Sequence, residues 1–328
     1  MESLLFALNA VAPIILLVVI GYLLKRGGYI KESFIKSGNK LVFRFFLPAM
    51  LFLNIYKIET FGGINLGYIV YVAVVLLAVF AISIPLCLMV AKKRESVGAL
   101  LQATFRSNYA LIGIPLAQSL FGDEGAMVAT LLSAVSISMF NVLAVISLTA
   151  FRAGGKKTSV KEVLGDIVKN PLLQSIALGL LVLVVRSLFV RWNVEFRLSE
   201  IEPLFKVLTY LSNIATPLAL LVLGAEFEFS AIKGLRREIV FGTLMRTFFV
   251  PLFGIGISFL FFADQFTGAH FAAFVAVFAT PVAVSSVPMA QEMGGDATLA
   301  GQLVVWTTLF SAVSVFLAAF LLRLGGIF

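Results

Sequence analysis

The sequence has 328 residues, of which 60% are hydrophobic and 13% charged, and its mean hydropathy is +1.05. A soluble domain of this size could not bury so much apolar surface, so the composition predicts an all-α polytopic membrane protein. The formal charge of +8 could indicate nucleic-acid binding, but the basic residues lie in short loops between apolar runs, which is the pattern that orients membrane proteins. We therefore expect a lipid bilayer, and no nucleic acid, as a partner.

Ten apolar segments of roughly 20 residues, the length that a bilayer requires, can be drawn along the chain. The predicted spans are 4–24, 38–56, 66–91, 97–121, 126–150, 170–190, 204–224, 239–262, 268–292 and 298–322. The first run has no basic region before it and no cleavage site after it, so we expect it to be kept as a span.

Basic residues are concentrated in alternate loops. They follow the first, third, fifth and seventh spans: Lys25, Arg26, Lys31, Lys36 and Lys40; Lys92, Lys93 and Arg94; Arg152, Lys156, Lys157, Lys161 and Lys169; Lys233, Arg236 and Arg237. The other loops hold fewer, chiefly Lys57, Arg191, Arg197 and Lys206. The positive-inside rule then places both termini outside the cytoplasmic membrane.

The basic segment after the fifth span divides the chain into two halves. We expect a first five-helix repeat in residues 1–153, a cytoplasmic linker at 154–169, and a second repeat in 170–328. Since each half has an odd number of spans, the second repeat would enter the membrane in the opposite sense.

A short internal repeat supports this division. Ile114–Asp123 and Val287–Asp296 share proline, alanine, glutamine, glycine and aspartate in register. Carried back in the same register, Asn108 falls opposite Pro281. Interrupted helices at matched positions of two halves are typical of the binding site of a secondary transporter. The expected helix-break residues are Gly113, Pro115, Pro281 and Pro288.

Polar residues inside the fourth span are the first candidates for a binding site. Arg106 would supply a fixed cation for an anionic substrate, or it would extend to the membrane surface and leave the cavity. Asn108 would bind a carboxylate or hydroxyl group, or it would only hold helices together. Other candidate substrate-binding residues are Ser107, Tyr109, Thr280, Pro281, Val282 and Ser285.

Several other residues favour ordinary roles. Asp123 and Asp296 each follow a glycine and precede an apolar run, which favours N-capping. Arg246 is expected near the cytoplasmic end of its span, in an interfacial position. Cys87 and His270 are the only cysteine and histidine, so no intrachain disulfide and no Cys/His metal cluster is expected. No cofactor is expected, and coupling to Na⁺ or H⁺ stays open.

The motifs resemble those of the auxin efflux carrier family of membrane transport proteins. Arg106–Tyr109 leading to Gly113–Leu116 is similar to its fourth-span motif, and Ala279–Pro281 leading to Ala290–Glu292 is similar to its ninth. The resemblance covers essentially the whole chain. The chain departs from the plant members in its short central linker and in Ser107, which stands where plant carriers have proline, and the Arg106 position is closer to the bacterial pattern.

This resemblance implies a fold and a mechanism. It implies ten helices in two inverted five-helix repeats, as in bile-acid transporters and sodium/proton antiporters, with crossing helices four and nine broken at the site. Spans 1, 2, 6 and 7 would form a scaffold through which a homodimer forms, and spans 3–5 and 8–10 would form a moving transport domain. The implied activity is elevator-type export of a small organic anion, such as a mono- or dicarboxylate.

Three alternatives remain on the sequence alone. One is a sodium- or proton-coupled organic-anion symporter of the bile-acid-transporter type. Another is a membrane sensor that binds a ligand without transporting it. An intramembrane enzyme is disfavoured because the sequence has no zincin motif, no aspartate-rich metal pair and no serine/histidine constellation.

Overall fold

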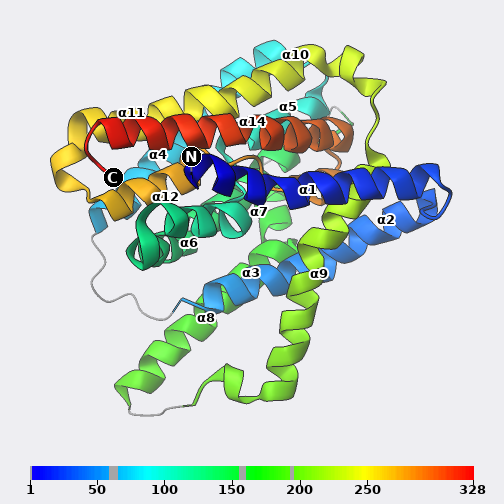
Figure 1. Cartoon of the computed structure of the whole chain (residues 1–328). Coiled ribbons are helices and arrows are strands. Elements are labelled where there is room, and N and C mark those ends of the chain that lie inside the picture. The colour runs from blue at the N-terminus through cyan, green and yellow to red at the C-terminus, as the bar shows by residue number, and fades with distance from the viewer. Residues whose placement is uncertain (1, 59–65, 155–159, 193–195) are drawn as a thin grey trace.

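The computed structural model is all-helical and describes residues 2–58, 66–154, 160–192 and 196–328 (Figure 1). The α-helices are α1 Glu2–Arg26, α2 Glu32–Leu41, α3 Leu47–Tyr56, α4 Leu66–Val90, α5 Arg94–Phe105, α6 Ile114–Ala150, α7 Val160–Lys169, α8 Pro171–Arg191, α9 Glu202–Glu226, α10 Ala231–Leu244, α11 Val250–Phe262, α12 Gly268–Phe278, α13 Ser286–Glu292 and α14 Ala297–Leu324. Short π-helical segments (η1 Val42–Phe46, η2 Tyr109–Gly113, η4 Met245–Phe249) and 3₁₀ turns (η3 Leu198–Glu200, η5 Ala263–Gln265) connect some of them. The helical class predicted from composition is confirmed.

Six helical stretches of the described chain are long and apolar enough to cross a bilayer. They are Leu66–Val90, Tyr109–Ala150, Pro171–Arg191, Glu202–Glu226, Ala231–Gln265 and Ala297–Leu324. The ten predicted spans are therefore met in part. Helix breaks shorten some of the predicted spans, and one stretch joins two of them.

The joined stretch contains the end of the predicted fourth span and the whole of the fifth. Within α6 the backbone turns at Phe121 (φ −141°, ψ 28°) and Gly122 (φ 60°, ψ −153°). That conformation of Gly122 is essentially restricted to glycine, because a Cβ atom would clash with the backbone. The two predicted spans thus meet at a sharp turn without an intervening loop.

Two other predicted boundaries also differ from the structure. The ninth span is divided into α12 and α13, with residues 279–285 outside any helix. The segment expected as a linker contains the helix α7.

Two helices begin with an ordinary N-cap. The Asn170 side chain accepts hydrogen bonds from the first turn of α8, and the Asp296 side chain accepts one from the first turn of α14. The capping role predicted for Asp296 is confirmed.

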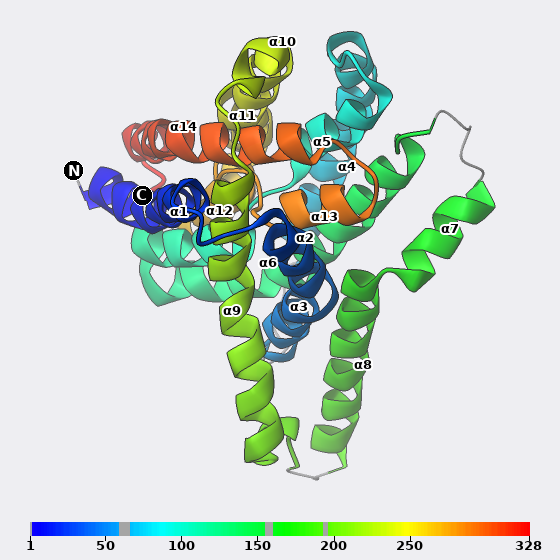
Figure 2. The ribbon, with the colours of Figure 1, turned by 90° about the vertical axis from the view of Figure 1, so that its right-hand side faces the viewer.

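The helices form two neighbouring groups. Helices α8 and α9 both extend away from the bundle that contains α4, α5, α10 and α11 (Figures 1 and 2). Helix α3 packs on α8 and α9, and α1 packs on both α9 and α14. Many large apolar side chains of α8 are exposed, as expected for a surface that faces lipid.

Helix α12 lies in the interior of the other group. It packs chiefly on α6 and α11, and its residues from Phe271 to Phe278 are all buried. An apolar sequence on every face of a helix requires such surroundings. The segment 279–285, which follows α12 and interrupts the predicted ninth span, therefore lies in the middle of the protein.

Candidate functional site

Two helix breaks meet in the interior. The first interrupts the chain between α5 and η2 at residues 106–108, and the second lies between α12 and α13. Ser107 and Val282 form an isolated antiparallel bridge, and the backbone N–H of Asn108 donates to the carbonyl of Pro281 over 2.8 Å. We call residues 106–108 with 279–285 the crossing.

Backbone groups freed by the breaks are satisfied by polar side chains. The hydroxyls of Ser107 and Thr280 lie 2.7 Å apart, and both also approach the carbonyl of Ala276. The N–H of Val282 donates to the Thr307 hydroxyl of α14 over 3.1 Å. Such pairing is what permits non-helical backbone to lie at membrane depth.

The residue types explain the break in the second segment more directly than in the first. Pro281 has no N–H to donate and disfavours helical geometry in the residue before it. Pro115 and Pro288 lie in the first turns of α6 and α13, positions where a missing N–H costs little. The breaks therefore precede these two prolines.

Gly113 is needed for close packing at the crossing. A Cβ atom on Gly113 would lie 2.8 Å from the Tyr109 ring and 3.0 Å from the carbonyl oxygen of Ala276. Its hydrogen atom lets η2 approach α12 closely. Tyr109 itself is buried and donates its hydroxyl to Ala129 of α6 over 2.8 Å.

The side chain of Arg106 is buried at the crossing. One guanidinium nitrogen donates to Gln102 over 2.8 Å and contacts the Met289 sulfur. The other donates to Asn141 over 3.0 Å and to the Ser285 hydroxyl over 2.8 Å. These acceptors are uncharged, and Arg106 forms no ion pair within the described residues, so its charge is available to stabilise an anion at short range.

Arg246 is a second buried arginine, and the sequence-based expectation for it was wrong. Its side chain is fully buried in η4, whereas an interfacial position was expected. It donates to the carbonyls of Thr280 and Val277, each over 2.7 Å, and to that of Thr104 over 3.4 Å. Its partners are backbone carbonyls of segments at least 31 residues away in the chain, so local sequence gives no signal for this placement.

A cavity of about 730 Å³ adjoins the crossing. Helices α1, α3 and α9 line one side, and Asn108, η2, Val284 and Ser285 line the other. The side-chain amide nitrogens of Asn108 and Asn54 are buried and have no hydrogen-bond partner within the described residues. Unpaired buried donors are unfavourable, so both are suited to a ligand with acceptor oxygens.

Three predicted site residues line this cavity and the others lie behind it. Asn108, Pro115 and Ser285 are at its wall. The predicted residues that do not line it are Arg106, Ser107, Tyr109, Gly113, Thr280, Pro281, Val282 and Pro288. The sequence analysis missed Asn54, Lys57, Asn213 and Thr216, which also line it. Asn54, a polar residue in an apolar run, carries the same signal that marked Asn108.

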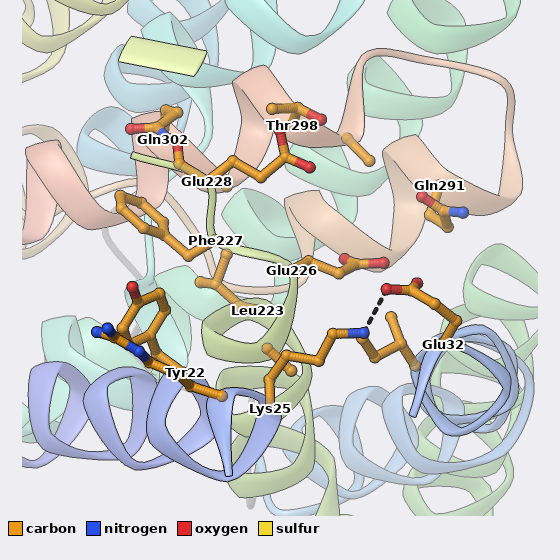
Figure 3. Close-up of a pocket in the computed structure, with 15 residues that line it drawn as sticks. Tyr22, Lys25, Glu32, Leu223, Glu226, Phe227, Glu228, Gln291, Thr298 and Gln302 are labelled. Atoms are coloured by element: carbon orange, nitrogen blue, oxygen red, sulfur yellow. Dashed lines mark hydrogen bonds and ion pairs between the residues drawn. The ribbon is translucent and has the colours of Figure 1, made fainter. Parts of the chain in front are cut away.

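A second cavity, of about 490 Å³, also lies against α1 and α9. It is lined by the ends of α1 and α9 and by the facing ends of α13 and α14 (Figure 3). Lys25 forms an ion pair with Glu32 at its edge, and Glu226, Gln291 and Thr298 point into it (Figure 3). We call the boundary between α1 and α9 on one side and the helices next to the crossing on the other the seam. It contains two cavities, at two positions along α1 and α9.

The fold and these cavities together define a membrane protein with a polar pocket between two helical groups. Among the described residues no cluster of His, Cys, Asp and Glu could hold a metal ion. A polar pocket beside two broken helices is the arrangement typical of a membrane transport protein.

Comparison with known proteins agrees. The family model described as "Membrane transport protein" matches residues 6–163 and 156–318, so the chain belongs to this family, that of the auxin efflux carriers. The chain is 25% identical to an uncharacterized transporter of Methanothermobacter thermautotrophicus over 314 residues, which covers 94% of this chain and 95% of that protein. It is 28% identical to an uncharacterized transporter of Methanocaldococcus jannaschii over 69% of this chain and 70% of that one.

Proposed function

We propose that this protein is a secondary transporter, working as an exporter, that carries a small organic anion such as a mono- or dicarboxylate. The observation that carries the proposal is the cavity at the crossing. It presents the amide donors of Asn54 and Asn108, which have no hydrogen-bond partner in the part of the chain that the structure describes. Ser285 joins its wall to the buried guanidinium of Arg106. Amide and hydroxyl donors backed by a cation suit a carboxylate, which only accepts hydrogen bonds.

In this proposal Asn54, Asn108 and Ser285 contact the substrate, and Arg106 acts from behind. Arg106 holds the Ser285 oxygen, so the hydroxyl hydrogen of Ser285 is free to point into the cavity. Lys57 lies on the cavity wall and is exposed, and it would attract anions at the entrance.

Transport would proceed by an elevator-type movement along the hollowed seam. Spans 1, 2, 6 and 7 would form the scaffold and the remaining spans the transport domain. Two cavities lie along α1 and α9, one at Asn54 and one at Glu226. In an elevator-type movement the substrate would pass from one cavity to the other. The positive-inside rule assigns the cavity at Lys25 to the cytoplasm and both termini to the outside of the cytoplasmic membrane.

The proposed architecture is ten spans in two inverted repeats. Its support is the sequence repeat and the hydrogen bond between Asn108 and Pro281, which occupy matched positions of the two halves.

The exposed apolar face of α8 is the proposed contact of a homodimer formed through the scaffold. Light scattering of the detergent complex, corrected for bound detergent, gives the molecular mass that tests this.

Counterflow in proteoliposomes tests the function. Vesicles loaded with an unlabelled mono- or dicarboxylate should accumulate the same labelled anion, and protein-free vesicles should not. Imposed sodium or proton gradients should drive uptake if the protein is instead a coupled symporter. A carboxylate that raises the apparent Tm of the purified protein without any counterflow would favour a sensor and refute the transporter.

A further inference from the structure

Three backbone carbonyl groups surround the guanidinium of Arg246. Val277 lies in the last turn of α12, Thr280 lies two residues beyond the end of that helix, and Thr104 lies in the last turn of α5. All three carbonyls accept hydrogen bonds from the one guanidinium group. The carboxyl-terminal ends of both broken helices therefore converge on a single positive charge.

Electrostatics explains why a cation belongs there. The last carbonyls of a helix have no partner within the helix and carry partial negative charge. Where a membrane helix is broken, unwound carbonyls and half-helix ends of this kind commonly bind Na⁺. Arg246 enters from η4, a third element, and forms no ion pair within the described residues, so the carbonyl dipoles are its only counter-charge there.

We propose that Arg246 is a built-in replacement for a coupling cation, and that the transporter works without binding Na⁺ at the crossing. This inference rests on the proposed transport function and decides one of its open points. A dissociable ion would join α5 and α12 only at sufficient ion concentration. A covalently attached guanidinium keeps the two helix ends joined throughout the transport cycle, and it already occupies the carbonyls that a metal ion would use as ligands.

The inference is tested first on purified Arg246→Ala protein by thermal unfolding in potassium salt. Loss of the three hydrogen bonds should lower the apparent Tm by about 5 °C or more. Millimolar guanidinium should restore part of that loss, whereas urea, its uncharged analogue, should not. Arg236→Ala, which removes an exposed arginine of α10, should behave as the wild type in every condition.

If Arg246 served only to fill space, the apparent Tm of Arg246→Ala would be restored by neither compound, or by urea and guanidinium equally. Either result overturns the inference. Wild-type protein provides a second measurement that does not depend on the variant folding. Its apparent Tm and its counterflow rate should each be the same in sodium and potassium salts. Counterflow that requires Na⁺ would refute the built-in cation and leave the proposed transport intact, whereas absence of any counterflow would refute transport and leave the thermal test valid.

Discussion

Asn108→Ala should separate substrate binding from stability. The Asn108 side chain makes no hydrogen bond within the described residues, and its amide nitrogen is buried without a partner. Its link to Pro281 is made by the backbone and survives the substitution. Removing the amide therefore orphans no protein group, and the free energy of unfolding should change by less than about 1 kcal/mol.

The effect on the substrate should be much larger. A hydrogen bond to a carboxylate contributes about 1.5–3 kcal/mol, which is about 10- to 150-fold in affinity. Concentration-dependent counterflow, or thermal shift by the transported anion, measures this loss. Equal insertion and yield of the two proteins in liposomes is the control.

Asn141→Ala provides the contrasting variant. Asn141 accepts a hydrogen bond from Arg106 over 3.0 Å and donates to Ile137 over 2.8 Å. Its loss leaves a buried guanidinium short of an acceptor and should destabilise the protein by about 1–3 kcal/mol. The reasoning is refuted if Asn108→Ala keeps wild-type affinity, or if it lowers the apparent Tm as much as Asn141→Ala does.

Three further predictions concern the crossing and its neighbourhood. Gly113→Ala should cost about 1–3 kcal/mol by overpacking and should slow counterflow, since neighbouring atoms lie 2.8 and 3.0 Å from the new Cβ. A double-mutant cycle of Ser107→Ala and Thr280→Val, scored by apparent Tm, should give a favourable coupling of about 0.6 kcal/mol, and zero coupling would contradict their hydrogen bond. Gly122→Ala should destabilise by about 1–3 kcal/mol because φ is +60° there, whereas Gly234→Ala, in open space within α10, should stabilise slightly.

The sequence predicted the location of the crossing better than its construction. Register alone placed Asn108 opposite Pro281, and their backbones are hydrogen-bonded. That inference was possible because proline and glycine leave a local signature wherever a helix begins or ends. The prolines that revealed the repeat, Pro115 and Pro288, proved to start the following helices.

The contacts of the two arginines could not be predicted in the same way. Arg106 was singled out because charge is rare in an apolar span, but its position behind Ser285 depends on residues 35 to 183 positions away. Arg246 resembled any basic residue near the end of a span. Its role depends on carbonyls that exist as free acceptors only because other helices are broken.

On the proposed function, the two arginines would make the crossing selective for charge. Each guanidinium is buried, and each is paired with uncharged oxygen or sulfur acceptors within the described residues. Dipoles can satisfy hydrogen bonds, but they leave the net positive charge in place, and at low dielectric that charge acts strongly on a neighbouring ion. A cation entering the cavity would be repelled, and a neutral solute would leave the field unbalanced. On the proposed mechanism, an anion bound between Asn54 and Asn108 balances this charge within the transport domain. The transport domain with its anion bound would therefore move through the membrane more easily than the empty one.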